Sequence, residues 1–266
     1  MSIKITGTGS FIPKNIIKND EFLNRIFFDK DGKSYPNSNR EIIDKFQAIT
    51  GIRERRYADQ NHNTSDLATF AAENSIKSAN IDKETLDYII VAHNFGEIDA
   101  NSNNYIALPS LASLVKHKLG IENPNCVAYD LIFGCPGWVE GVIQSSAYIK
   151  TGMAKKCLVI GADTLSRTVD SNDRDSMIFA DGAGASIIEE SSESGGILSH
   201  KTVTHAGKEA LYLFADRSYN PESESKIKHI KMNGRKVYEF AISTIPEALK
   251  ECLEESGKKI EDVKKI

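Results

Sequence analysis

Residues 129–141 read YDLIFGCPGWVEG and contain a cysteine in an unusual setting. The pattern predicts a short apolar strand, a tight turn that carries the cysteine, and then a helix that runs to about Thr151. Gly134 and Gly137 flank Cys135, so the backbone can turn sharply where a side chain would clash. We therefore expect Cys135 at or just before the N-terminus of a helix.

That position suits a nucleophile. Pro136 has no N–H and a fixed φ, which fits the first turn of a helix. The free N–H groups and the helix dipole there favour thiolate over thiol, and they can also hold a developing oxyanion. A lone cysteine in an apolar segment is most often a small buried side chain. The two flanking glycines, which a packed cysteine does not need, favour the catalytic interpretation.

Length and composition define the broad class of protein. A chain of 266 residues with 40% hydrophobic and 26% charged residues can form one large or two smaller globular domains. Its net charge of −4 gives no reason to expect nucleic acid as a partner, and no apolar run is long enough to cross a membrane. Cys126, Cys157 and Cys252 lack metal-ligand spacing and are predicted to be packing residues, which fits a reduced cytoplasm.

Strands and helices are expected to alternate through the first part of the chain, which predicts a mostly parallel α/β sheet. The predicted strands are residues 3–9, 86–92, 126–131 and 157–163, and the predicted helices begin at Thr64 or Ser65 and cover 109–119 and 139–150. His93 and Asn94 follow the second of these strands, where open α/β sheets place ligand groups, although a lone His is more often structural. The small residues 182–186 are expected to pack beside Cys135.

The later part of the chain predicts a second unit. Residues 190–196 are polar and form the best linker candidate, and a new strand is expected from Ile197. A polar insertion over 207–225 and an amphipathic helix over 237–256 follow. Residues 248–266 repeat the pattern of residues 71–92 but end where the strand should begin. This predicts a first unit over 1–190 and a second unit over 191–266 in a truncated chain.

The cysteine turn and the Asp181–Ala185 segment together resemble the beta-ketoacyl-acyl carrier protein synthase III family of the thiolase superfamily. Further matching motifs lie at Ile5–Pro13, Thr50–Arg55, Cys135–Trp138, Asp173–Arg174 and Met232–Gly234, so the resemblance covers essentially the whole chain. It implies a thiolase-like layered α/β fold (αβαβα), with the first half complete and the second half incomplete.

The resemblance also implies a reaction. Cys135 would take an acyl group from an acyl-coenzyme A as a thioester. Malonyl-acyl carrier protein would then lose carbon dioxide, and its enolate would attack the acyl-cysteine to give a 3-oxoacyl-carrier protein, in fatty-acid initiation or in a secondary-metabolite pathway. The Cys135 N–H would contribute to an oxyanion hole. No cofactor is expected beyond coenzyme A as part of the substrate, and a homodimer through the first half is implied.

Two residues match positions that contact substrate in the family. Arg174 matches the arginine near the coenzyme A mouth, although a surface ion pair explains it equally well from the sequence. Leu108 matches the position that borders the acyl pocket from the partner subunit. The family's adenine-stacking tryptophan and its neighbouring arginine fall at Lys45 and Ile49 here, so the acyl donor stays open.

Family members also use a histidine, in a His-Gln-Ala-Asn motif, and an asparagine from the second half. Neither motif occurs in this sequence, and none of its six histidines lies at a matching position. Two alternatives to the condensing enzyme therefore remain. One is an acyltransferase on the same fold that uses an alcohol, an amine or water, and the other is a catalytically silent, truncated dimerisation partner.

Overall fold

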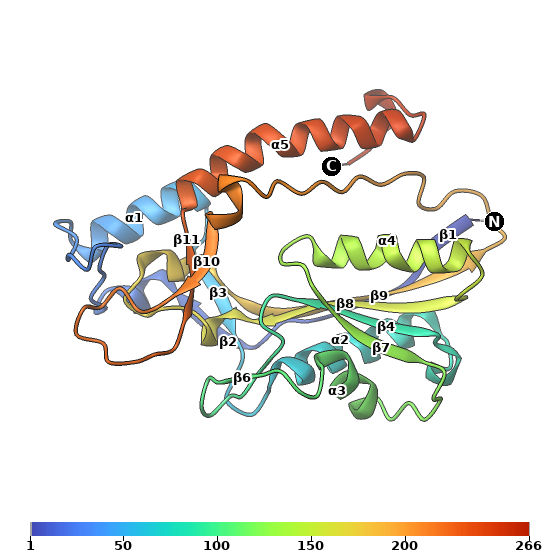
Figure 1. The fold of residues 1–266 in the computed structure, drawn as a ribbon, viewed down its shortest axis with the longest axis horizontal. Coiled ribbons are helices and arrows are strands. Elements are labelled where there is room, and N and C mark those ends of the chain that lie inside the picture. Colours follow the sequence, from blue (N-terminus) through green and yellow to red (C-terminus); the bar gives the residue numbers. More distant parts are fainter. Residues whose placement is uncertain (1, 266) are drawn as a thin grey trace.

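A five-stranded mixed sheet forms the centre of the computed structural model, which describes residues 2–265 (Figure 1). The strands lie in the order β1-β9-β8-β4-β7. Their bounds are Ser2–Phe11 (β1), Tyr88–His93 (β4), Val127–Ile132 (β7), Lys156–Thr164 (β8) and Asp181–Ser191 (β9). Strand β4 runs parallel to β7 and β8, whereas β9 runs antiparallel to both β8 and β1.

The prediction of a mostly parallel sheet is wrong for β1 and β9. Between β8 and β9 the chain forms only short 3-10 turns, at Leu165–Arg167 and Arg174–Ile178, and no crossover helix. A parallel neighbour needs such a crossover, so the chain turns back and β9 pairs antiparallel.

Helices cover both faces of this sheet (Figure 1). Helices α2 (Thr64–Ala79) and α3 (Leu111–Lys118) pack on one face, and α4 (Gly137–Lys150) packs on the other. The alternation of strands and helices predicted for this part of the chain is confirmed. Smaller elements surround the layers: α1 (Asn39–Thr50) and the short strands β2 (Asn15–Lys18), β3 (Glu54–Tyr57), β5 (Glu97–Ile98) and β6 (Tyr105–Ile106).

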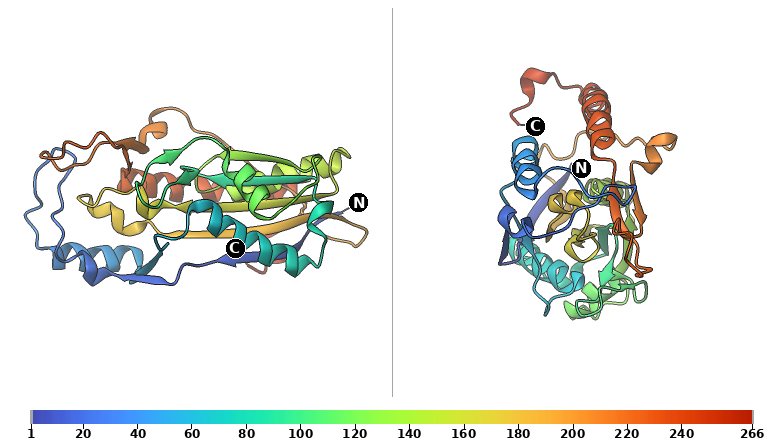
Figure 2. Two further views of the ribbon diagram at one scale, coloured as in Figure 1. Left: turned by 90° about the horizontal axis from the view of Figure 1, so that it is seen from below. Right: turned by 90° about the vertical axis from the view of Figure 1, so that its left-hand side faces the viewer.

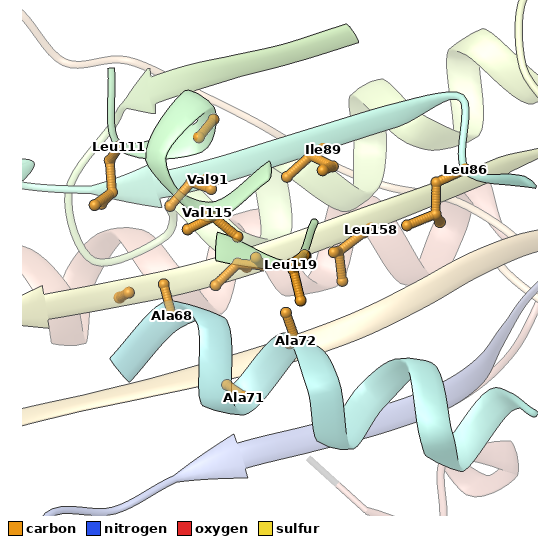
Figure 3. Packing of buried hydrophobic residues seen from close by; sticks show 14 of the residues in the cluster. Ala68, Ala71, Ala72, Leu86, Ile89, Val91, Leu111, Val115, Leu119 and Leu158 are labelled. Carbon is orange, nitrogen blue, oxygen red and sulfur yellow. The ribbon is translucent and has the colours of Figure 1, made fainter. Parts of the chain in front are cut away.

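The larger hydrophobic core lies between the sheet and the α2–α3 face (Figure 3). Leu111 and Val115 of α3 pack there with Ile89 and Val91 of β4, and all four are almost completely buried. On α2 the buried positions facing the core are alanines, Ala68, Ala71 and Ala72. These small side chains allow α2 to lie very close to the strands.

Close approach is most evident where α2 crosses β1. A Cβ atom at Gly9 would lie 2.2 Å from the Ala71 carbonyl oxygen and 2.4 Å from the Ser75 backbone nitrogen. Because both atoms belong to the backbone of α2, neither can move aside as a side chain could. Glycine at position 9 therefore fixes the distance between the helix and the strand.

The α4 face is held by a second cluster. Val142 and Ile149 of α4 pack against Cys157 and Val159 of β8. Gly141 allows this contact, because a Cβ atom there would lie 2.7 Å from Val159 Cγ1.

The strand expected from Ile197 does not form, since residues 197–206 contain no strand. The backbone donates one hydrogen bond to the sheet there, from Ile197 N to Ile3 O at 3.0 Å. A ladder needs a neighbouring strand along its length, and this segment instead runs between α4 and α5 (Figure 1), where Ser199 bonds to Cys252 O and Thr202 to Glu140. The expected polar insertion contains β10 (Leu213–Asp216), which pairs with β11 (His229–Met232).

The long C-terminal helix is confirmed as α5 (Gly234–Glu255), and it stands apart from the sheet (Figure 2). None of its residues is buried. No helix within residues 2–265 is long and apolar enough to span a membrane.

A buried ionic cluster joins β11 to the segment that follows β8. The Lys231 side chain is completely buried, and its Nζ lies 2.5 Å from Asp170 Oδ2 and 3.3 Å from Asp173 Oδ2. The same Nζ lies 3.4 Å from the centroid of the Tyr219 ring. Since a buried charge that loses its partner is costly, this cluster fixes the second part of the chain to the first.

Asp175 lies beside this cluster, and its Oδ1 is 3.8 Å from Arg174 Nε. Burial and the neighbouring Asp173 carboxylate raise its pKa to about 6, although Arg174 and Lys231 oppose the change. The folded protein therefore disfavours the ionised form of Asp175.

Gly9→Ala should destabilise the protein by about 2 kcal/mol, because the new methyl group meets the backbone of α2. Gly184→Ala is the matched control. Gly184 lies opposite Ser10 in the same pair of strands, and a Cβ atom there meets nothing within 4 Å. Urea unfolding measures both changes, and equal loss of stability in the two variants would contradict the proposed steric cause.

Asp175→Asn should change the pH dependence of stability. With a folded pKa of about 6, above the ordinary value, the folded state binds more protons than the unfolded state between the two values. Wild-type stability therefore rises as the pH falls through about 6. The asparagine variant should be the more stable protein at about pH 7.5, and its advantage should shrink at about pH 5.

The Asp175 side chain is 36% exposed, so solvent screening reduces the size of this effect. Urea unfolding midpoints at the two pH values give the difference. If the asparagine variant kept the same advantage at both pH values, the raised pKa of Asp175 would be excluded as its cause.

Candidate active site

The three parallel strands bring their carboxyl ends to one edge of the sheet. Ala92 of β4 lies opposite Leu131 of β7 on one side and Gly161 of β8 on the other. The residues just beyond this line therefore gather at that edge. Among them are Asn94 and Cys135, which follow β4 and β7.

The turn around Cys135 has the predicted form. Gly134 adopts a φ of +77°, which favours glycine, and its carbonyl accepts a hydrogen bond from Gly137 N at 2.9 Å. Helix α4 begins at Gly137, where a Cβ atom would lie 2.9 Å from Ala92 Cβ. The start of the helix thus rests against β4, and Cys135 is exposed at the tip of the turn.

Cys135 lines a cavity of about 290 Å³ at this edge of the sheet. Its other walls include Asn94, Asp163, Trp138 and the Gly182–Gly184 stretch of β9. The small residues of β9 therefore lie beside the cysteine turn, as predicted. Trp138 covers Gly161, where a Cβ atom would lie 3.5 Å from Trp138 Cβ.

Asn94 and Asp163 form a hydrogen-bonded pair in the cavity wall. Asn94 Nδ2 donates to Asp163 Oδ2 at 2.7 Å, and Asn94 N donates to Asp163 Oδ1 at 3.0 Å. Burial raises the pKa of Asp163, although the hydrogen bonds from Asn94 oppose it. Asn94 Oδ1 lies 3.4 Å from the Cβ position of Gly134, so the pair connects β8 to the cysteine turn.

Asp163 is a site residue that the sequence analysis missed. Asn94 was singled out because it follows a strand, but Asp163 lies within β8 and carries no motif of its own. Its acidic side chain at the end of an otherwise apolar strand is the signal that could have identified it.

The remaining cysteines lie elsewhere and differ from Cys135. Cys126 and Cys157 are buried, and desolvation raises the pKa of Cys126 and raises that of Cys157 to about 12. Cys252 is half-buried on α5, with Sγ 3.3 Å from Ser199 Oγ. Cys135 is thus the exposed thiol of the four. The packing role predicted for Cys126 and Cys157 is confirmed.

His93 does not line the cavity. It is buried, and its Nε2 lies 3.2 Å from Asp130 Oδ2. Asp130 accepts hydrogen bonds from Leu111 N and Ala112 N at the start of α3, at 2.8 and 2.7 Å. Burial raises the pKa of Asp130, but His93 and these amides outweigh it, so the pKa lies below its ordinary value. His93 therefore supports α3, as the structural interpretation predicted.

Neither of the predicted substrate contacts, Arg174 and Leu108, lines the Cys135 cavity. The Arg174 guanidinium lies over the ring of Tyr35, 4.4 Å from its centroid, and its side chain is 46% exposed. The Arg174 Nε also lies 3.8 Å from Asp175 Oδ1. Leu108 precedes α3 and is 84% exposed. Tyr35 was missed, because only the folded loop brings it to Arg174.

The Cys135 N–H has no hydrogen-bond acceptor within residues 2–265, so it is available to a substrate oxygen. Within the same residues no group of three or more His, Cys, Asp or Glu side chains is arranged to hold a metal ion. The arrangement offers an exposed thiol, a free backbone donor and an uncharged amide around one cavity. These are the groups that acyl transfer through a thioester needs.

The known proteins that this chain resembles are acyl-carrier-protein synthases. Residues 129–206 match the family model described as 3-Oxoacyl-[acyl-carrier-protein (ACP)] synthase III. The beta-ketoacyl-[acyl-carrier-protein] synthase III of Clostridium acetobutylicum is 36% identical, over 98% of this chain and 74% of that protein. The corresponding synthase III 1 of Vibrio vulnificus is 37% identical, over 97% and 73%.

Solved structures confirm the thiolase-like α/β fold. The crystal structure of 3-oxoacyl-[acyl-carrier-protein] synthase III from Aquifex aeolicus superposes with a TM-score of 0.80, at 31% identity, over 98% of this chain and 74% of that one. The priming beta-ketosynthase of the R1128 polyketide pathway shares the fold, with a TM-score of 0.78 at 22% identity.

The division at residue 190 and the truncated second unit stay predictions.

The predicted family resemblance is confirmed by relatives that align along nearly all of the chain. Since one of them is 36% identical and is itself covered over 74% of its length, the chain belongs to the beta-ketoacyl-[acyl-carrier-protein] synthase III family.

Proposed function

We propose that this chain acts as a condensing enzyme of the 3-oxoacyl-[acyl-carrier-protein] synthase III type, with Cys135 as the nucleophile that carries the acyl group. The observation that supports it best is the exposed Cys135 thiol at a glycine-flanked turn, beside a cavity and before α4. Acyl-coenzyme A and malonyl-acyl carrier protein are the proposed substrates, with no cofactor, in the cytoplasm.

The first step is transfer of the acyl group. The Cys135 thiolate attacks the thioester carbonyl, the carbonyl oxygen accepts a hydrogen bond from the Cys135 N–H, and the coenzyme A thiolate leaves. In the second step malonyl-acyl carrier protein loses carbon dioxide. The resulting enolate attacks the acyl-cysteine, releases the Cys135 thiolate and forms the 3-oxoacyl-carrier protein.

Arg174 is the proposed contact for the coenzyme A end of the donor. Its guanidinium is half-exposed and already held over the Tyr35 ring, so a phosphate or an adenine ring can bind it with little further ordering of the side chain. The nearby Asp175 carboxyl attracts the guanidinium from 3.8 Å and does not cover it.

Leu108 is the proposed border of the acyl pocket in a homodimer. Strand β7 is an edge strand with an exposed apolar residue at each end, since Val127 is 47% and Ile132 is 69% exposed. An uncovered apolar edge favours pairing with a second chain. Leu108, 84% exposed before α3, would then face the partner and not solvent.

Cys135→Ala should abolish condensation, with a loss of about 1000-fold or more in rate. The assay combines an acyl-coenzyme A with malonyl-acyl carrier protein and measures both carbon dioxide and 3-oxoacyl product. Cys252→Ala, which removes a thiol outside the cavity, is the control and should keep activity. A product formed without loss of carbon dioxide would instead support the acyltransferase alternative.

Arg174→Ala should raise the KM for acyl-coenzyme A by about tenfold and leave kcat nearly unchanged, because the contact is remote from the reacting carbonyl. Arg217→Ala, in the exposed loop after β10, provides the control for a lost surface charge. Steady-state kinetics separate the two constants. A fall in kcat with an unchanged KM would assign Arg174 a different role.

A further inference from the structure

We propose a second ligand site, for a small organic cation, in a cavity beside α2. The cavity has a volume of about 430 Å³ and lies between the end of β1, the loop before α2 and α2 itself. We call it the α2 pocket, and its main residues are Phe11, Lys14, Asp59, His62, Phe70 and Glu73. It shares no lining residue with the Cys135 cavity.

Three rings form the apolar part of the α2 pocket. The centroids of Phe11 and Phe70 lie 4.8 Å apart. The His62 ring stands almost perpendicular to both, at 86° to Phe11 and 83° to Phe70, with centroids 6.1 and 5.3 Å away. The rings therefore form a corner in which ring faces point in more than one direction. A cation can bind such faces through the ring quadrupoles.

Carboxylates add negative charge to this corner. Within residues 2–265 Glu73 forms no ion pair, and it is exposed at the pocket wall. Asp59 Oδ2 lies 3.3 Å from His62 Nδ1. Lys14 is the one lysine or arginine among the lining residues, and Asp59 already pairs with His62, so Glu73 is the carboxylate left for a ligand. An unpaired carboxylate beside aromatic rings favours a ligand with a positive charge.

The walls of the pocket are held in place before any ligand binds. The Arg167 guanidinium donates to the carbonyl oxygens of Asp59 and His62, at 2.9 and 2.6 Å, and fixes the loop. Asn74 Nδ2 donates to Ser10 O at 3.1 Å and ties α2 to the end of β1. A ligand would therefore lose little free energy in ordering the site.

The chemistry distinguishes an organic cation from a metal ion. The described residues contain no cluster of three metal-ligating side chains, at this pocket or elsewhere in the chain. A hydrated metal ion would also gain nothing from the phenylalanine rings. An alkylammonium group can bind the rings with its methyl groups and the carboxylates with its charge.

The test compares choline with 3,3-dimethylbutan-1-ol, its neutral isostere, by calorimetric titration and by NMR shifts of the protein's aromatic protons. Choline should bind the intact chain saturably, and the neutral alcohol should bind about tenfold more weakly or not at all. Equal affinity for the two compounds, or the absence of saturable choline binding, would overturn the proposal.

Choline binding by variants of the lining residues tests where the ligand binds and whether negative charge there favours it. Phe70→Leu and Glu73→Gln should each weaken choline binding several-fold, whereas Glu122→Gln, an exposed residue outside the pocket, should not. Lys14→Ala should strengthen binding by removing repulsion. Thermal melting confirms that each variant folds. Weaker binding in Lys14→Ala, or unchanged binding in both Phe70→Leu and Glu73→Gln, would contradict an organic-cation site here.

Discussion

The contact between the start of α4 and strand β4 determines where the reactive thiol lies. Gly137 lets the first turn of the helix rest against Ala92, and Gly134, with its positive φ, lets the backbone reach that turn from β7. Together these two glycines place Cys135 at the exposed tip of the turn between them. A side chain at position 137 would move the helix away from the sheet, and the thiol, the free backbone donor and the cavity would no longer coincide.

Contacts elsewhere in the fold hold the sheet and the segments around the Cys135 turn in place. Helix α2 lies close to β1 because Gly9 leaves room for the helix backbone at Ala71 and Ser75, and this packing fixes one face of the sheet. The Asn94–Asp163 pair joins β8 to the turn across the cavity. The buried Lys231 cluster fixes β11 to the segment that carries Arg174. Stability and site geometry thus depend on the same few close contacts.

Much of this could be predicted from the sequence because it is local. The glycines and the proline around Cys135 determine a turn over a few residues, and apolar runs mark β4, β7 and β8 by their own composition. The direction of β9, the pairing of Asp163 with Asn94 and the placement of Tyr35 over Arg174 depend on register and on loop packing between distant segments. No pattern in a single strand encodes these, and the strand expected at Ile197 failed for the same reason, since it lacks a neighbour.

Intact mass spectrometry after incubation with a series of acyl-coenzyme A thioesters tests the central claim most directly. The expected result is a single added acyl group, which peptide mapping locates on Cys135. This adduct should be absent from Cys135→Ala and present in Cys252→Ala. An adduct on Cys126, Cys157 or Cys252, or no adduct from any thioester, would contradict the assignment of Cys135 as the nucleophile.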